Sequence, residues 1–262
     1  MITLLTDFGL TDPYVAQMKG VIRTTNSDVE IVDISHGIRK HDIAMGSYIL
    51  ETTVSFFPKD TIHVAVVDPG VGGSRLPIVV VCDRGVLVGP DNGLLARASD
   101  RLGFCEASKI ADQQFIREPL SSTFHGRDIF ALTAAKLALS PMSRNVGPRV
   151  ASIDRLNIPK PGAIDSNITC AVLYVDSFGN VVTNISEELL SQLGIDDPTE
   201  FKVTTSMGTH EGLVVRSYSE LPKDQLGLIL GSQGYLEIAA REGSAAAGLL
   251  VEPLNQLKIS FR

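Results

Sequence analysis

The sequence lacks several features that mark common protein classes. It has no stretch of about 20 apolar residues, so we expect no transmembrane helix and no membrane partner. No basic run of useful length interrupts a chain whose formal net charge is -7, and this argues against a nucleic-acid partner. The first residues, MITLLTDFG, lack the basic and long apolar regions of a signal peptide, which predicts a cytoplasmic protein.

The usual catalytic and metal-binding motifs are missing as well. GVGGSR has neither the Gly-Lys-Ser/Thr ending of a phosphate-binding loop nor the glycine spacing of a dinucleotide site, and no Gly-x-Ser-x-Gly elbow is present. No two histidines have the spacing of a zinc helix. Cys82, Cys105 and Cys170 are an odd number at wide spacing, which indicates free thiols in a reducing compartment. We therefore expect no metal, no cofactor and no covalent nucleophile.

What is present is the composition of a soluble globular protein, with 44% hydrophobic and 20% charged residues among 262. This length suits two modest domains or one large one. The first part alternates β-branched runs with stretches of helical period. We predict buried strands at Ile2 to Thr6, Glu30 to Ile34 and Thr61 to Val67, and helices at Tyr14 to Thr24 and His41 to Phe57. This order predicts a mostly parallel sheet with right-handed crossovers.

The following segment predicts a hairpin and two more helices. PIVVVCDRGVLVGP indicates two strands around a tight Asp-Arg-Gly turn, and Asp91 or Asn92 is placed to cap a short helix after it. A later helix is predicted from Ile129 to Leu139, with Asp128 as its N-cap. The helix at His41 to Phe57 has Asp42 in its first turn, where a carboxylate is favourable.

The stretch LNIPKPGAIDSN carries two prolines, a glycine and no periodicity, which predicts a linker. We therefore expect an N-terminal α/β domain over residues 1–156, a linker over residues 157–167 and a smaller C-terminal domain over residues 168–262. The last part consists of alternating or apolar β segments separated by turns. It indicates a small antiparallel barrel or sandwich.

Polar residues follow the predicted parallel strands, beyond whose carboxyl ends ligands usually bind. The clusters are TDFGLTD with Asp7 and Asp12, DISHG with Asp33 and His36, and DPGVGGSR with Asp68 and Arg75. A fourth cluster, FHGRD at residues 124–128, precedes a predicted helix. Any single one is explained as a turn or cap, and we assign structural roles to Asp33, Asp42, His36 and His63. Their coincidence at one sheet edge favours a binding or catalytic site.

The C-terminal part adds two polar clusters. YVDSFGNVVTN places Asp176, Phe178, Asn180 and Asn184 around a turn, and GSQGYLEIA places Ser232, Gln233 and Tyr235 at another. An aromatic ring beside amide and carboxylate groups suits a nucleoside with an amino-acid tail. A hairpin whose Asn and Gly residues only turn the chain explains the first cluster equally well.

Taken together, six motifs resemble those of the S-adenosyl-L-methionine (SAM) hydroxide adenosyltransferases, relatives of fluorinase and chlorinase. They are TDFGLTDPYVAQMKG, VVDPGVGGSR, GPDNGLL, STFHGRDIF, VDSFGNVVTNI and GSQGYLEIA, which follow one another in the family's order through nearly the whole chain. The resemblance implies an N-terminal α/β sandwich domain and a C-terminal antiparallel β-barrel domain. It also implies a homotrimer that binds each substrate between two subunits.

The resemblance further implies hydrolysis of SAM, the substrate rather than a cofactor, to adenosine and L-methionine. The family's catalytic set falls on Asp68, Arg75 and His125. The ribose-binding carboxylate falls on Asp7, and Phe124 matches a wall near the reacting carbon. The remaining substrate-binding positions are Asp12, Asp176 and Ser232 for methionine, Phe178 and Asn180 for the base, and Gln233, which stands where halogenases have Arg.

The halogenase branch differs from this sequence at informative places. It carries a long insertion where this chain has only the CDRGVLVGPDNG hairpin, and it has Tyr and Ser in place of His125 and Gly126. It also lacks the Asp found here as Asp68. The resemblance therefore favours a hydrolase, with a halogenase and a non-catalytic adenosine or SAM sensor as the alternatives.

Overall fold

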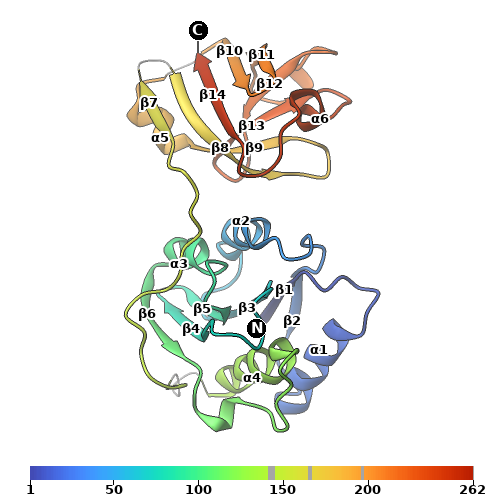
Figure 1. Ribbon diagram of the computed structural model, residues 1–262, viewed down its shortest axis with the longest axis vertical. Coiled ribbons are helices and arrows are strands. Elements are labelled where there is room, and N and C mark those ends of the chain that lie inside the picture. Colours follow the sequence, from blue (N-terminus) through green and yellow to red (C-terminus); the bar gives the residue numbers. More distant parts are fainter. Residues whose placement is uncertain (141–144, 165–166, 196–197, 262) are drawn as a thin grey trace. The chain divides into compact units, whose positions relative to one another are not determined.

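The computed structural model describes residues 1–140, 145–164, 167–195 and 198–261 (Figure 1). The chain divides into two compact units, Met1–Leu156 and Asn157–Arg262, and each is described by itself. No helix among the described residues is long and apolar enough to cross a membrane.

The first unit is built on a six-stranded, mostly parallel sheet in the order β2-β1-β3-β5-β4-β6, which confirms the predicted α/β class. The strands β2, β1, β3 and β5 run parallel, while β4 and β6 are antiparallel to their neighbours. Their bounds are β1 Ile2–Thr6, β2 Ile31–Ser35, β3 Thr61–Val66, β4 Pro77–Cys82, β5 Gly85–Pro90 and β6 Phe104–Lys109. The predicted hairpin is confirmed, since Cys82 pairs with Gly85 across the turn.

Helices cover both faces of this sheet (Figure 1). The bounds are α1 Tyr14–Thr25, α2 Ile43–Val54, α3 Ala96–Leu102 and α4 Leu132–Leu139. Met18 of α1 and Ala134 of α4 pack on one face, whereas Leu50 of α2 and Leu102 of α3 pack on the other. Because successive strand residues point to opposite faces, β-branched runs such as that of β3 fill both layers of the core.

Several local sequence predictions are wrong. β2 is half-buried rather than buried, since it lies at the sheet edge. Asp42 precedes α2 as its N-cap, where Oδ1 accepts from Met45 N at 2.9 Å, and is not in the first turn. Neither Asp91 nor Asn92 caps α3, because Asp91 Oδ1 accepts instead from Asp154 N at 2.7 Å.

Asp128 is also not an N-cap. It lies inside a π-helical turn, Gly126–Ala131, that leads directly into α4. Its fully buried carboxylate accepts hydrogen bonds from Arg127 Nε at 2.7 Å and from Ser121 N at 2.9 Å. Burial alone would raise the pKa of Asp128, but Arg127, Ser121 and Arg117 hold it below the ordinary value. The carboxylate therefore joins residues 117–121 to the turn that carries His125.

The second unit is a closed β-barrel of seven strands, with an eighth strand at its side. The strands are β7 Gly162–Ile164, β8 Asn167–Val175, β9 Val181–Ser186, β10 Glu200–Thr205, β11 Gly208–Val214, β12 Leu226–Leu230, β13 Tyr235–Ala240 and β14 Gln256–Phe261. β14 pairs with both β10 and β8, and so closes the ring. One pairing departs from the expected antiparallel pattern, because β11 and β12 run parallel.

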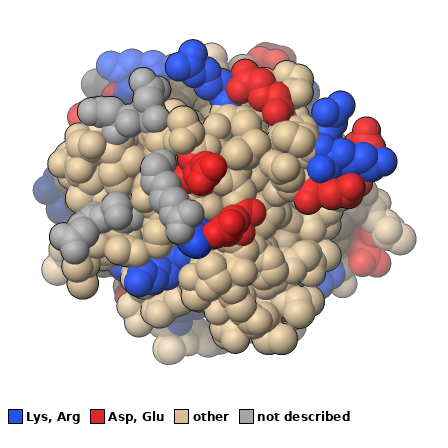
Figure 2. All heavy atoms as spheres, turned by 90° about the horizontal axis from the view of Figure 1, so that it is seen from above, with Lys and Arg blue, Asp and Glu red and all other residues tan. Residues whose placement is uncertain are grey.

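The barrel core is filled by buried side chains such as Val172, Phe201 and Ile238. Two short helices, α5 Glu187–Gln192 and α6 Ala245–Leu249, complete the unit. The segment expected as a linker contains β7, and residues 165–166 within it lie outside the described part. On the face turned to the viewer in Figure 2, acidic and basic side chains are interspersed among uncharged residues.

Candidate active site

Asp68 and Arg75 meet at the carboxyl end of β3. Arg75 Nε lies 3.0 and 3.1 Å from the two carboxylate oxygens of Asp68, and Arg75 Nη2 lies 2.5 Å from Oδ2. The side chain of Asp68 is only 5% exposed and that of Arg75 only 9%. Asn92 Nδ2 donates to Val67 O at 2.9 Å and so fixes the strand end that carries Asp68. The ion pair is therefore held in one geometry and largely screened from solvent.

The glycines between Asp68 and Arg75 allow the turn to approach a second segment. Gly72 has a φ of 76°, and a Cβ added there would overlap the carbonyl oxygen of Ser122. Only glycine satisfies both the left-handed backbone and this close approach. The approach brings the turn against residues 122–125, which carry His125.

His125 completes the polar set as a neutral hydrogen-bond donor. Its Nδ1 lies 2.7 Å from Arg75 Nη2. Because a guanidinium has donors and no acceptor, Nδ1 accepts this hydrogen bond and the ring proton lies on Nε2. Burial lowers the pKa of His125, and Arg75 lowers it further, against smaller opposite effects of Asp68 and Asp128. The site thus offers a carboxylate acceptor and an imidazole N–H donor joined by one guanidinium.

An aromatic cluster lies next to this set in the chain. The rings of Phe8, Tyr14 and Phe124 make edge-on or tilted contacts, with centroids 5.3 to 5.7 Å apart. Arg127 lies 5.0 Å above the Phe124 ring, and Phe124 itself is buried. A Cβ on Gly126 would press on Phe8 and Phe124 at 3.4 and 3.2 Å. The small residue at 126 therefore allows the two rings to pack beside His125.

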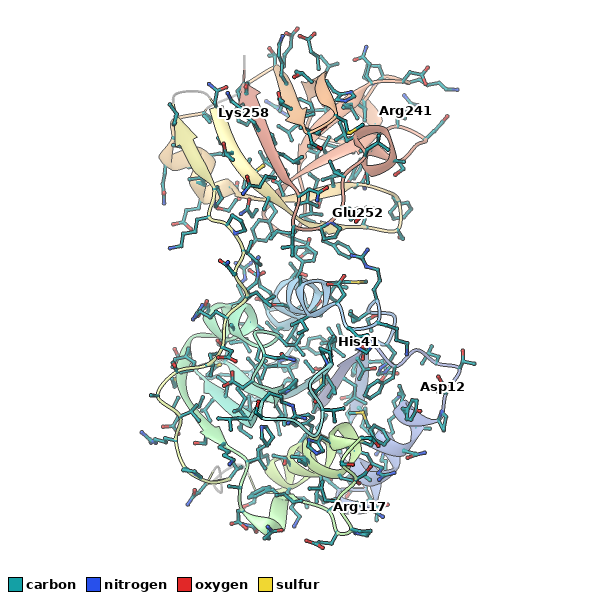
Figure 3. All side chains as sticks on the ribbon, in the orientation of Figure 1. Asp12, His41, Arg117, Arg241, Glu252 and Lys258 are labelled. Atoms are coloured by element: carbon teal, nitrogen blue, oxygen red, sulfur yellow. The ribbon has the colours of Figure 1, made fainter. Side chains whose placement is uncertain are left out.

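Asp7 follows β1 and is 6% exposed, so its carboxylate needs hydrogen-bond partners. Oδ2 accepts from the backbone N–H of His41 at 2.9 Å. His41 has a φ of 65°, an uncommon conformation for a residue with a side chain. Figure 3 shows His41 on the loop before α2 and Asp12 on the loop before α1. Asp12 is exposed.

The residues given structural roles are hydrogen-bonded inside the first unit. His63 Nδ1 lies 2.8 Å from Thr3 Oγ1, and burial lowers the pKa of His63 to about 4. His36 Nδ1 lies 2.8 Å from Thr6 Oγ1, and its Nε2 lies 3.1 Å from Asp33 Oδ1. The His36 contacts join the carboxyl ends of β1 and β2, whereas the His63 contact joins β1 to β3 within the sheet.

The second unit contains a pocket of about 660 Å³ beside the turn after β8. Of the residues expected to bind substrate, Asp176, Phe178 and Asn180 line it. Sequence reasoning missed its other lining residues, which are Tyr218, Leu221, Ala240, Arg241, Glu242 and Gly243. No local motif marks them, since they come from segments that meet only in the folded barrel.

Asp176 organises the turn at this pocket. Its Oδ1 accepts from the backbone N–H groups of Phe178 and Asn180, each at 2.9 Å, and Oδ2 accepts from Asn180 Nδ2 at 2.9 Å. Since its amide nitrogen donates to Asp176, Asn180 presents its carbonyl oxygen as an acceptor. Phe178 is 79% exposed, and its ring suits stacking against a flat ligand.

Ser232 and Gln233 lie in the turn between β12 and β13, where Ser232 is exposed and Gln233 half-buried. They are not among the residues that line the 660 Å³ pocket. Asn184, from the first C-terminal cluster, has a structural role, because it accepts from Ala171 N and donates to Pro159 O. Its side chain ties β9 to β8 and to the segment before β7.

An α/β unit with a buried Asp-Arg-His set, followed by a β-barrel with an aromatic pocket, defines a two-domain enzyme for a small molecule. Residues 2–147 match the model of the SAM hydroxide adenosyltransferase N-terminal domain, and residues 170–258 match that of the C-terminal domain. The chain therefore belongs to the SAM hydroxide adenosyltransferase family.

Individual relatives agree with this assignment. The chain is 36% identical to an (R)-S-adenosyl-L-methionine hydrolase of Salinispora arenicola, with 99% of this chain and 97% of the relative aligned. A fluorinase of Nocardia brasiliensis is more distant, at 28% identity over 94% and 92% of the two chains. The crystal structure of an uncharacterized conserved protein from Thermotoga maritima superposes with a TM-score of 0.93 at 34% identity, covering 99% and 100%.

Proposed function

We propose that this protein hydrolyses SAM to adenosine and L-methionine. The observation that carries the proposal is the Asp68–Arg75–His125 set, in which one guanidinium holds a carboxylate and a neutral imidazole. The Salinispora relative, named an (R)-S-adenosyl-L-methionine hydrolase and 36% identical over almost the whole chain, supports the same reaction. Halogenation is disfavoured, because the relative named fluorinase is more distant than the relative named hydrolase.

The proposed reaction demands little covalent chemistry from the protein. A sulfonium leaves as a neutral thioether, so the enzyme has to hold one water in line behind C5′ and exclude other water. The Asp68 carboxylate accepts a hydrogen bond from this water and receives its proton as the C–O bond forms. His125 donates a hydrogen bond from Nε2 to an oxygen atom of a molecule bound in the site. Arg75 holds the Asp68 carboxylate and the His125 imidazole in fixed relative positions. The reaction needs no metal and no cofactor.

Substrate recognition is proposed for residues of both units. Asp7 binds the ribose diol, with its carboxylate oriented by the His41 N–H, and Phe124 forms a wall near C5′. Phe178 stacks on the base, and the acceptor oxygen of Asn180 suits an exocyclic amino group. Asp12, Asp176, Ser232 and Gln233 are assigned to the methionine end.

We also propose a homotrimer with substrate sites at the subunit interfaces, located in the cytoplasm. The resemblance in the motifs supports the assembly, and three cysteines without a paired framework support a reducing compartment. Light scattering of the purified protein tests the oligomer, and a monomer that is fully active would contradict it.

The first experiment is incubation of the purified protein with SAM, in chloride buffer and in chloride-free buffer, with products followed by liquid chromatography. Adenosine and methionine at equal rates in both buffers are expected. A chlorinated nucleoside would assign the chain to the halogenases. Binding of SAM without any product would favour a sensor and refute the proposed reaction.

A further inference from the structure

Glu237 is a buried carboxylate outside the barrel core. It lies in β13, where Leu236 and Ile238 point into the core of the second unit. Because side chains alternate along a strand, Glu237 points to the other face, where Leu221 and Ala239 form a small separate cluster. It is only 8% exposed. Burial of a carboxylate is costly unless hydrogen-bonding partners compensate it.

Two contacts define the position of this carboxylate. The Tyr218 hydroxyl donates to Glu237 Oε2 at 2.8 Å. On the other side, a Cβ added to Gly231 would overlap Oε1, Cδ and Cγ of Glu237, so the carboxylate lies directly beneath Gly231. Tyr218 lines the 660 Å³ pocket, and Gly231 begins the turn that carries Ser232 and Gln233. One side chain therefore touches both parts of the surface assigned to substrate.

The electrostatics keep Tyr218 as the donor. Burial raises the pKa of Tyr218 to about 12, and the hydrogen bond to Glu237 contributes in the same direction. Burial also raises the pKa of Glu237, the Tyr218 hydrogen bond opposes that rise, and Asp176 adds to it. The phenol stays protonated across the physiological range, and its hydrogen bond fixes the direction of the ring.

We propose that Glu237 is a positioning residue that couples recognition of the base to recognition of the methionine end. Through Oε2 it sets the Tyr218 wall of the base pocket, and beneath Gly231 it sets the turn of residues 231–234. This inference deepens the proposed function and rests on it. It assigns a role to Glu237 in substrate affinity, and none in the chemical step.

The test compares Glu237→Ala, Glu237→Gln and Tyr218→Phe by calorimetry with adenosine alone and L-methionine alone, and by kcat and KM for SAM. Glu237→Ala should weaken both ligands about tenfold and raise KM similarly, because a charge-assisted hydrogen bond and a packing contact are lost. Its kcat should stay within about twofold, since the Asp-Arg-His set belongs to the other unit. Glu237→Gln keeps an acceptor and should restore binding to within about threefold of wild type. Tyr218→Phe should weaken adenosine alone.

Gly231→Ala tests the second contact without replacing Glu237. The new methyl group should displace Glu237 and weaken methionine about tenfold. In the Glu237→Ala background the same substitution should have no further effect, because the atoms that it would strike are gone. Gly248→Ala is the matched control, since a Cβ there meets nothing within 4 Å, and it should leave both affinities unchanged. Thermal unfolding of each variant confirms that it is folded.

Three outcomes of the binding measurements would overturn the proposal. These are unchanged affinity for both ligands in Glu237→Ala, a loss confined to adenosine, or a Glu237→Gln variant as weak as Glu237→Ala. A fall in kcat with unchanged KM would also refute it. Wild-type protein that binds both ligands but does not hydrolyse SAM would refute the proposed function alone, because the affinity ratios between variants do not depend on turnover.

Discussion

Replacing Asp68 by Asn is the most direct perturbation of the proposed reaction, because it keeps the shape and removes the charge. In the structure both Asp68 oxygens accept from Arg75, at 2.5 to 3.1 Å. Asn offers one oxygen and one NH₂ group, and Arg75 has no acceptor for that NH₂ group. At least one of these hydrogen bonds therefore becomes a contact between two donors.

The magnitude follows from the burial of the pair. Breaking a buried ion pair by removing one partner costs about 3–5 kcal/mol. Arg75 keeps His125 as an acceptor and lies 5.5 Å from the Phe130 ring centroid, so we expect the lower end, about 3 kcal/mol. The loss of turnover is a separate effect, because a group that receives a proton contributes about 10²–10⁴ in rate.

The assay combines product chromatography with calorimetry. We expect kcat of Asp68→Asn to fall by about 10²–10⁴, while the Kd for SAM changes less than about threefold, because Asp68 acts on the water. Asp83→Asn is the control, since Asp83 is exposed at the hairpin turn and its loss removes the same charge. A variant that keeps kcat within about threefold, or that loses only SAM binding, would refute the role given to Asp68.

Four further predictions test the surroundings of Asp68. In His125→Gln the side-chain amide keeps a donor near the position of Nε2, whereas in His125→Asn it keeps an acceptor near the position of Nδ1. Because the Nε2 donor serves the reaction, His125→Gln should retain about tenfold more kcat than His125→Asn. Equal losses would contradict the assigned tautomer. Because burial and Arg75 lower the pKa of His125 from 6.5, an acid limb of wild-type kcat/KM that reports this ring should be centred below pH 6.5, and a limb centred there or above would be inconsistent with a buried neutral ring. Gly72→Ala should destabilise the protein by about 1–3 kcal/mol and lower kcat, measured against Gly194→Ala, which shares the positive φ but meets no atom within 4 Å. Asp128→Asn should cost about 3 kcal/mol at pH 7 in denaturant unfolding. The pKa of Asp128 is lowered in the fold, so its stabilisation is present above 3.8 and lost as the pH falls through the folded value. The two proteins should therefore converge in strong acid, and a constant difference would refute the ionic role.

The sequence predicts the parallel sheet well, because its signal is local and redundant. β1 and β3 are β-branched runs buried on both faces, and helices of clear period follow β1 and β2. β2 fails as a buried strand for a reason that its own residues do not contain, namely its place at the edge. Asp128 fails as a cap for the same kind of reason. A local rule assigned it to the helix end, but the Ser121 N–H compensates its burial from another segment.

The residues of the candidate site also differ in whether the sequence alone predicts them. Asp68 and Arg75 could be found from the sequence, because a glycine turn and two charged residues lie in one short stretch. The protonation of His125 could not, since it depends on which Arg75 nitrogen faces which ring nitrogen across a gap of 50 residues in the chain. Glu237 is the extreme case. In sequence it is an ordinary polar residue of an alternating strand, for which solvent exposure is the natural expectation. It is buried only because the segment with Tyr218 and Leu221 covers that face of the barrel, and its two contacts come from residues 6 positions before it and 19 positions before it. A role of this kind emerges from packing, and it can be tested only by variants that change one contact at a time.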